Sequence, residues 1–183
     1  GIGIFGPNFL YNIYIYEPTP TLDNGSFETG NLIGWSHSTG ANIYEGNATD
    51  GDYFVRLTAQ AHAEGIPGLP PWGGGGGWDE NEQMLMQHFS ARAGDELTLD
   101  YRVSEHGADG IFGWGWLEAF IELSNLSLGT TEYYLSIDVW SANDWTSLSH
   151  IISEDGDYLL RFYVRAVAQA SAAPPPENPE DPP

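Results

Sequence analysis

The stretch Glu96-Leu-Thr-Leu-Asp-Tyr-Arg-Val103 alternates apolar and polar residues without a break. Successive side chains of an extended chain point to opposite faces, so one face collects the apolar residues Leu97, Leu99, Tyr101 and Val103. A strand with one apolar and one polar face is typical of antiparallel sandwich sheets, which bury one face and leave the other in water. This stretch therefore predicts a β-strand at the surface of a two-layer core.

The same alternation recurs at residues 116–123, 133–139 and 158–167, while glycines and prolines punctuate the chain and no amphipathic helix stands out. Short alternating strands separated by turn residues favour a sandwich over a βαβ fold. We predict an all-β, antiparallel jelly-roll β-sandwich. Its expected core residues are Leu97, Leu99, Tyr101, Leu117, Ile121, Leu135, Ile137, Leu160 and Phe162.

Three parts follow from composition along the 183 residues. Residues 1–20 form an N-terminal extension with a long apolar run, and residues 21–167 form the sandwich. Residues 168–183 are a proline-rich acidic tail, expected to be a solvated extension.

The chain is strongly acidic, with 26 Asp and Glu against five arginines, no lysine and a formal net charge of −21. Such a field repels nucleic acid and anionic membranes, and no apolar run approaches the roughly 20 residues of a membrane helix. There is no cysteine, hence no disulfide framework. Because the sequence begins at Gly1 without an initiator Met or signal peptide, we expect a processed protein, extracellular or at the cell surface.

Several motifs occur in a recognisable order. Asn24-Gly-Ser-Phe-Glu28 precedes Gly34-Trp35, and Asp50-Gly-Asp-Tyr-Phe-Val-Arg-Leu57 follows. Later come Ala93-Gly-Asp-Glu-Leu, Trp145 and Gly156-Asp-Tyr-Leu-Leu-Arg-Phe162. Over about residues 21–167 this order resembles the family 4/9-type carbohydrate-binding modules and the wider galactose-binding-like jelly rolls.

The resemblance implies a structural calcium ion near the first strand. By position its ligands would be the Glu28 and Asp50 carboxylates with the Ser26 and Tyr53 carbonyls, a hard oxygen set that suits calcium. In the alternative interpretation Glu28 caps a turn and Asp50 is an ordinary loop residue.

The chain departs from the family at its end, where no further strand follows residues 158–167. A sandwich without its last strand has an unpaired edge and an open apolar groove. A spare strand of suitable composition, Tyr11-Asn-Ile-Tyr-Ile-Tyr-Glu17, lies at the other end of the chain. Ile13 and Ile15 would face the groove, and Glu17 would approach the calcium site.

This donor strand, which includes Tyr11 and Tyr16, has two possible acceptors. It folds back onto its own domain in a permuted sandwich, or it inserts into the next molecule. Insertion into a neighbour is heterologous and builds an open, pilus-like filament, a homopolymer. We expect this donor-strand exchange because prolines 18 and 20 resist a tight return, and we expect a structural protein as its function.

The alternative function is a non-catalytic carbohydrate-binding or adhesin module with polysaccharide as its partner. Trp72, Trp78 and Trp114 adjoin glycine-rich stretches and are the candidate sugar platforms, together with Trp140. Trp35, Trp116 and Trp145 occupy pattern positions and are expected in the core.

No arrangement predicts catalysis. Glu118 and Glu122 lie four residues apart on one strand, about 13 Å by strand geometry, whereas paired glycosidase carboxylates face each other about 5 to 9.5 Å apart. Asp79, Glu80 and Glu82 are expected in an acidic loop. Three glycosylation sequons begin at Asn24, Asn47 and Asn125; the last two are expected in loops that accept glycans.

Overall fold

The computed structural model of the chain describes residues 22–61, 78–103, 113–138 and 144–170. These residues contain nine strands and no helix, and the strand pairs are antiparallel. This confirms the predicted all-β antiparallel sandwich. Within the same ranges no helix is long and apolar enough to cross a membrane.

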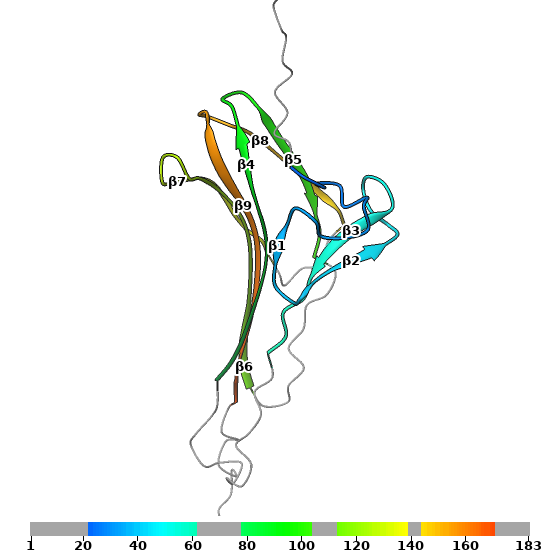
Figure 1. The fold of residues 1–183 in the computed structure, drawn as a ribbon. Helices are drawn as coiled ribbons and strands as arrows, with labels where there is room; N and C mark the ends of the chain where they lie inside the picture. The colour runs from blue at the N-terminus through cyan, green and yellow to red at the C-terminus, as the bar shows by residue number, and fades with distance from the viewer. Residues whose placement is uncertain (1–21, 62–77, 104–112, 139–143, 171–183) are drawn as a thin grey trace, which may run out of the picture.

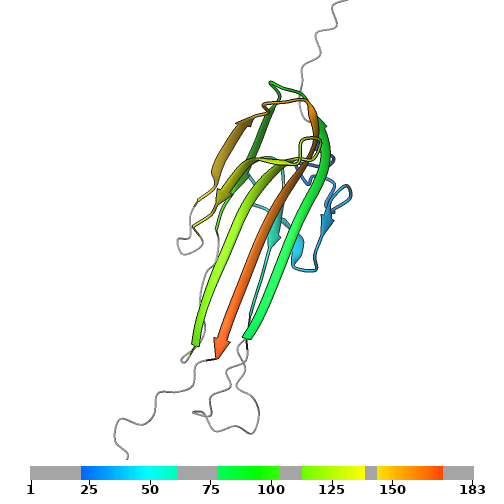
Figure 2. The same ribbon diagram turned by 90° about the vertical axis from the view of Figure 1, so that its left-hand side faces the viewer.

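One layer is a continuous five-stranded sheet in the order β1-β4-β9-β6-β7. Its strands are β1 (Ser36–His37), β4 (Trp78–Ala91), β9 (Gly156–Ala170), β6 (Gly113–Asn125) and β7 (Thr130–Ser136). The three long central strands curve together, as Figures 1 and 2 show.

The second layer consists of two separate strand pairs. One pair is β2 (Ala41–Glu45) with β3 (Tyr53–Leu57), and the other is β5 (Glu96–Tyr101) with β8 (Thr146–Ile151). Both pairs lie over the same side of the long sheet (Figure 1). The strand of residues 96–101 agrees with the alternation that predicted it.

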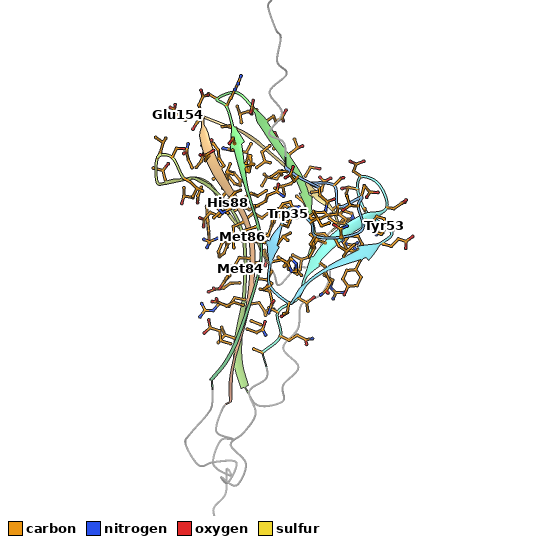
Figure 3. All side chains as sticks on the ribbon, in the orientation of Figure 1. Trp35, Tyr53, Met84, Met86, His88 and Glu154 are labelled. Carbon is orange, nitrogen blue, oxygen red and sulfur yellow. The ribbon has the colours of Figure 1, made fainter. Side chains whose placement is uncertain are left out.

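The core lies between the layers. Its buried centre includes Leu85, Ile121 and Leu160, each no more than 1% exposed. Trp35 lies between the sheet and the second layer (Figure 3), 7% exposed, with its ring 6.1 Å from that of Phe162. The prediction that Trp35 belongs to the core is confirmed.

Polar side chains of β4 fasten the segment that precedes β2 to the sheet. Gln87 Nε2 donates to the carbonyls of Asp23 and Gly34 at 2.8 and 2.9 Å. Gln83 Oε1 accepts the amide of Gly40 at 2.6 Å. Because both glutamines are buried, these hydrogen bonds fix where β2 and β3 stand relative to the long sheet.

Candidate functional site

Every strand of the second layer has one edge that no described strand covers, and the edges of β3 and β5 are the two that concern this site. β3 is hydrogen-bonded to β2 alone, and β5 to β8 alone, among the residues that the structure describes. A strand with one partner keeps half of its backbone N–H and C=O groups unpaired along its other edge. The two free edges therefore offer hydrogen bonds to a further strand.

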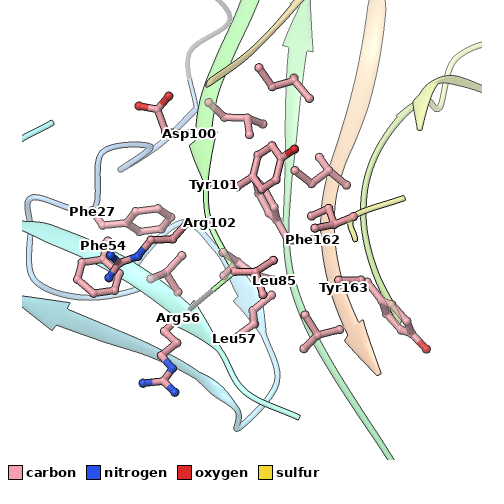
Figure 4. A pocket seen from close by; sticks show the side chains of 18 of the residues that line it. Phe27, Phe54, Arg56, Leu57, Leu85, Asp100, Tyr101, Arg102, Phe162 and Tyr163 are labelled. Atoms are coloured by element: carbon pink, nitrogen blue, oxygen red, sulfur yellow. The ribbon is translucent and has the colours of Figure 1, made fainter. Parts of the chain in front are cut away.

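Both free edges border one cavity of about 1160 Å³. Its walls come from β3 and β5, and its floor is the inner face of the long sheet. Figure 4 shows Leu57 and Tyr101 pointing from the two walls toward Leu85 and Phe162 on the floor. We call this cavity the groove; residues lining its apolar part are Val55, Leu57, Leu99, Tyr101, Leu85, Ile121, Leu160 and Phe162.

The groove divides the predicted core residues into two sets. Leu97, Ile121 and Leu160 are at least 96% buried, as expected. The others are only half-buried: Leu99, Tyr101, Leu117, Leu135, Ile137 and Phe162. For Leu99, Tyr101, Leu117, Ile137 and Phe162 the structure gives the reason, because these side chains line the groove.

Aromatic and cationic side chains gather at the outer rim of the groove. We call Tyr44, Phe54, Arg56, Arg102 and Trp145 the rim cluster. The rings of Tyr44 and Phe54 stack at 5.9 Å, and Trp145 meets Phe54 edge-on at 5.9 Å. The Arg102 guanidinium lies 4.9 Å from the Trp145 ring centre and 5.5 Å from that of Phe54.

The expectation that Trp145 belongs to the core is therefore wrong. Trp145 is partly buried, and its Nε1 donates to the carbonyl of Asn47 at 2.9 Å. Trp145 precedes β8, whereas Asn47 belongs to the turn between β2 and β3. The hydrogen bond therefore links the two strand pairs across the end of the groove. Trp116 lies in β6, and its side chain is outside the described set.

Asp100 contributes a fixed negative charge near the rim. Ser147 Oγ donates to its carboxylate at 2.5 Å, and this bond, with a second from Thr49, lowers the pKa of Asp100 below its usual value. The carboxylate is thus ionised at neutral pH, and its residue lines the groove together with the rim cluster.

The predicted calcium ligands lie in two adjoining turns. Glu28 Oε1 accepts the amides of Asp52 and Tyr53, each at 2.9 Å. Gly51 packs so tightly that a Cβ there would stand 2.2 Å from Glu28 Cδ. Glu28 therefore holds the turn before β3, as the alternative interpretation had it, and leaves Oε2 as the oxygen for a cation.

Ser26, Asp50 and Tyr53 line the same end of the groove. Among the described residues no three Asp, Glu or His side chains come together as a metal site. The predicted calcium set draws on two backbone carbonyls as well, so calcium at this turn stays a prediction. Glu17 and the donor strand, with Tyr11, Ile13, Ile15 and Tyr16, lie outside the described residues.

The structure assigns two of the candidate sugar-binding tryptophans to strands. Trp78 is the first residue of β4, and Trp114 lies in β6, although the sequence favoured a loop for it. Both have Gln169 of β9 as their Cα partner, so the sheet brings them to one register on either side of β9. Their side chains, and all of Trp72 and Trp140, lie outside the described set.

The expected acidic loop is also wrong, because residues 79–82 belong to β4. Arg165 Nε lies 2.6 Å from Glu80, and the Arg165 guanidinium also approaches Glu82 and Glu118. Glu122 pairs with Arg161 at 2.7 Å. These carboxylates form ion pairs on the outer face of the long sheet, where the cross-strand register with β9 decides the partners.

Asn125 corrects the glycosylation expectation. It ends β6 and is 1% exposed; its Nδ2 donates to the Tyr158 hydroxyl at 2.9 Å, and its Oδ1 accepts the amide of Leu128. A glycan needs an accessible amide nitrogen, so the folded domain cannot present this sequon. Asn24 is likewise engaged, donating to Asn31 O at 2.7 Å, whereas Asn47 is exposed.

A polar network closes the end of the sandwich near Asn125. The Tyr158 hydroxyl lies 2.7 Å from Glu132 Oε2, and Glu132 Oε1 accepts from His150 and from the amide of Ser153. Burial raises the pKa of Glu132, but these hydrogen bonds outweigh it and hold the pKa below its usual value. Burial and the neighbouring carboxylate raise the pKa of Tyr158 to about 12.

Neither the rim cluster nor this network was foreseen. The polar-face positions of Arg56 and Arg102 were visible in the alternation, but their convergence depends on the spacing of two strands that do not pair. Glu132 and Tyr158 are 26 residues apart and carry no motif. The available signal was compositional, since arginine is scarce in this chain, and three of the five arginines line this cavity: Arg56, Arg102 and Arg165.

No family model matches the sequence, and no curated protein matches it. Among solved structures the chain is similar to TmCBM61, a carbohydrate-binding module solved in complex with β-1,4-galactotriose. The two are 16% identical, with a TM-score of 0.49, over 83% of this chain and 94% of that one.

Proposed function

We propose that this chain is a non-catalytic, extracellular structural subunit that polymerises by donor-strand exchange. Residues 1–20 of one molecule insert into the groove of the next, and the repeat of this contact builds a surface filament. The observation that carries the proposal is the groove itself, about 1160 Å³ of mostly apolar space between two free strand edges.

An open groove of this kind is unfavourable in an isolated protein. Free edges template pairing with other chains, and an exposed apolar patch of this size marks an interaction surface. A single added strand satisfies both, because its backbone pairs with β3 and β5 while alternate side chains enter the groove. The chain carries one such segment, residues 11–17, with isoleucine at alternate positions 13 and 15.

The main free-energy gain of insertion comes from burial of apolar side chains. Burying two isoleucines and several tyrosine rings yields on the order of 10 kcal/mol at about 25 cal/mol per Å². Ordering of the arm and of the subunit offsets a large part of that gain. The edge hydrogen bonds then decide specificity, since unmade bonds inside a closed groove are costly.

Deletion of residues 1–17 tests the proposal. The variant is expected to form no filaments in negative-stain electron microscopy and to leave a poorly stable, aggregation-prone monomer. A synthetic peptide of residues 9–21 should restore folding without restoring polymerisation. A deletion variant that is monomeric, soluble and as stable as the parent would contradict the proposal. If the intact protein is a stable monomer with the arm in its own groove, the filament proposal is rejected.

Calcium at the Glu28 turn is a linked proposal. An ion held by Glu28 Oε2, Asp50 and the carbonyls of Ser26 and Tyr53 would stiffen the loop beside the groove. The carboxylate of Glu17 in the arm would supply further negative charge to this ion. A cation bound only by the folded state stabilises by mass action. Excess chelator should therefore lower the melting temperature, and Glu28→Gln should remove that response; an unchanged melting curve rejects the ion.

Carbohydrate binding is the second candidate function. The observation that favours it is the common register of Trp78 and Trp114 on the two sides of β9. In affinity gel electrophoresis over a polysaccharide panel that includes β-1,4-galactan, the parent protein should be retarded and Trp78→Ala, Trp114→Ala and Trp72→Ala should each weaken retardation. Trp35→Phe, a core control, should not; equal migration of all variants in every gel rejects this candidate.

A further inference from the structure

The rim cluster lies where the outward-facing side chains of an inserted strand would emerge. Phe54 and Arg56 of β3 stand on one side of the groove, and Arg102, which follows β5, stands on the other. Arg102 already reaches across to Phe54, with 5.5 Å from its guanidinium to the ring centre. The Arg56 guanidinium lies 5.8 Å from the ring centre of Tyr44. Both cations therefore pack against aromatic faces on the outer surface of the second layer.

A strand between β3 and β5 presents two different environments to its two faces, because its side chains alternate. The inward face meets the aliphatic and aromatic floor around Leu85 and Phe162. The outward face has as neighbours Arg56, on the polar face of β3, and Arg102, which directly follows β5. Directly opposed and diagonal side chains on one sheet face interact. The outward side chains of an inserted strand would therefore contact two guanidinium groups and a phenylalanine ring.

Arginine stacks on aromatic faces and gains cation–π attraction. Because the chain has no lysine, arginine is the residue that supplies this attraction here. Outward carboxylates would add negative charge to an assembly of chains that each carry a formal charge of −21. Small polar side chains at the outward positions would leave the contacts of the two guanidinium groups unchanged and would add no attraction between the strand and the groove.

We infer that the groove is selective for β-strands with branched aliphatic residues on the inward face and aromatic residues on the outward face, which stack on Arg56 and Arg102. The inference rests on the proposed strand-accepting function and names the class of strand that it accepts. Residues 12–16 have this pattern: Ile13 and Ile15 share one face, and Tyr14 and Tyr16 share the other. The tyrosines of the arm are thus recognition residues for the arginines.

The full-length chain provides the test. Tyr14→Ser with Tyr16→Ser should raise the critical concentration for assembly about five- to thirtyfold, from the loss of two exposed cation–π contacts of about 0.5–1 kcal/mol each. Sedimentation of polymer measures the change. Tyr14→Phe with Tyr16→Phe keeps both rings and should assemble as the parent does. Tyr14→Glu with Tyr16→Glu should be at least as defective as the serine variant.

A double-mutant cycle separates recognition from stability. Arg102→Gln alone loses its contacts to Phe54 and Trp145, but in the Tyr14→Ser, Tyr16→Ser background its further effect on assembly should be markedly smaller. Arg92→Gln, in the turn between β4 and β5, is the matched arginine control and should be additive with the tyrosine changes.

The failure of the inference differs from failure of the proposed function. If the parent assembles and the serine variant assembles at the same concentration, or if the glutamate variant assembles better than the parent, strand insertion stands and the aromatic selectivity is wrong. If the parent does not assemble and an added peptide of residues 9–21 neither binds it nor changes its unfolding midpoint, strand acceptance itself is wrong.

Discussion

The two ends of one hydrophobic core are closed in different ways. Near Asn125 the sandwich ends in a network in which Glu132, His150 and Tyr158 satisfy one another's polar groups, and Tyr158 is fully buried. Between β3 and β5 the same core opens into the groove, and inward-facing residues such as Leu99 and Phe162 are only half-buried. The comparison teaches that, among the described residues, side chains of the domain itself close the core near Asn125, whereas no described strand fills the position between β3 and β5.

Large-to-small substitutions should separate the two regions most clearly. Leu123→Ala, at a fully enclosed site outside the groove, is expected to cost about 2–5 kcal/mol of unfolding free energy, because it removes buried methyl groups and leaves a cavity. Leu99→Ala, on the groove wall, should cost clearly less in dissociated full-length protein. Urea unfolding by circular dichroism measures both; equal losses would mean that Leu99 is covered as closely as Leu123.

Removal of one hydroxyl should weaken the closed end. Tyr158→Phe keeps the ring stacked on Phe89 at 5.8 Å but leaves Glu132 Oε2 and Asn125 Nδ2 without their partner. Stranded buried polar groups cost about 1–3 kcal/mol. Tyr163→Phe, whose hydroxyl bonds Glu82 on the exposed outer face, is the matched control and should cost much less. Equal effects in thermal melts would contradict the closed network.

The turn that carries the groove wall allows a finer comparison between two glycines with positive φ. Gly51→Ala is strained by its backbone angle of +74° and drives Cβ into the Glu28 carboxyl group, which must release the amides of Asp52 and Tyr53. Gly46→Ala, at φ +96°, meets nothing within 4 Å. Both variants bear backbone strain of roughly 1 kcal/mol. The additional loss of unfolding free energy in Gly51→Ala, measured by urea unfolding, therefore reports the hydrogen bonds by which Glu28 holds the turn. Identical losses would mean that Glu28 does not hold the turn.

The smallest expected effect is on pH dependence. Since the folded-state pKa of Glu132 lies below its ordinary value, its stabilising contribution is fully present above about pH 4.5 and is lost as the pH falls through the folded-state pKa. Glu132→Gln should flatten the acid limb of the stability curve and leave the groove unaffected. A steeper acid limb in the variant would show the opposite sign of the shift.

Strand positions and faces were predictable because they depend on local alternation. Residues 96–103 showed both the strand and its inward residues, and the chain order of the motifs predicted the sandwich. The rim of the groove was not predicted, because Arg102 and Phe54 are neighbours only through two strands that share no hydrogen bonds. Trp145 was misplaced for the same reason.

The sequence by itself determined the described strands through period-two patterns and turn residues. The spare strand at residues 11–17 stays a prediction, because it lies outside the described residues. Tertiary structure alone decided how deeply each inward residue is buried, which sequon is accessible and which acid meets which arginine. The physical reason is range. Alternation acts between neighbouring residues, whereas burial depends on what lies on the far side of a sheet. Asn125 shows this most simply, as a loop-like sequon in the chain and a buried hydrogen-bonded residue in the fold.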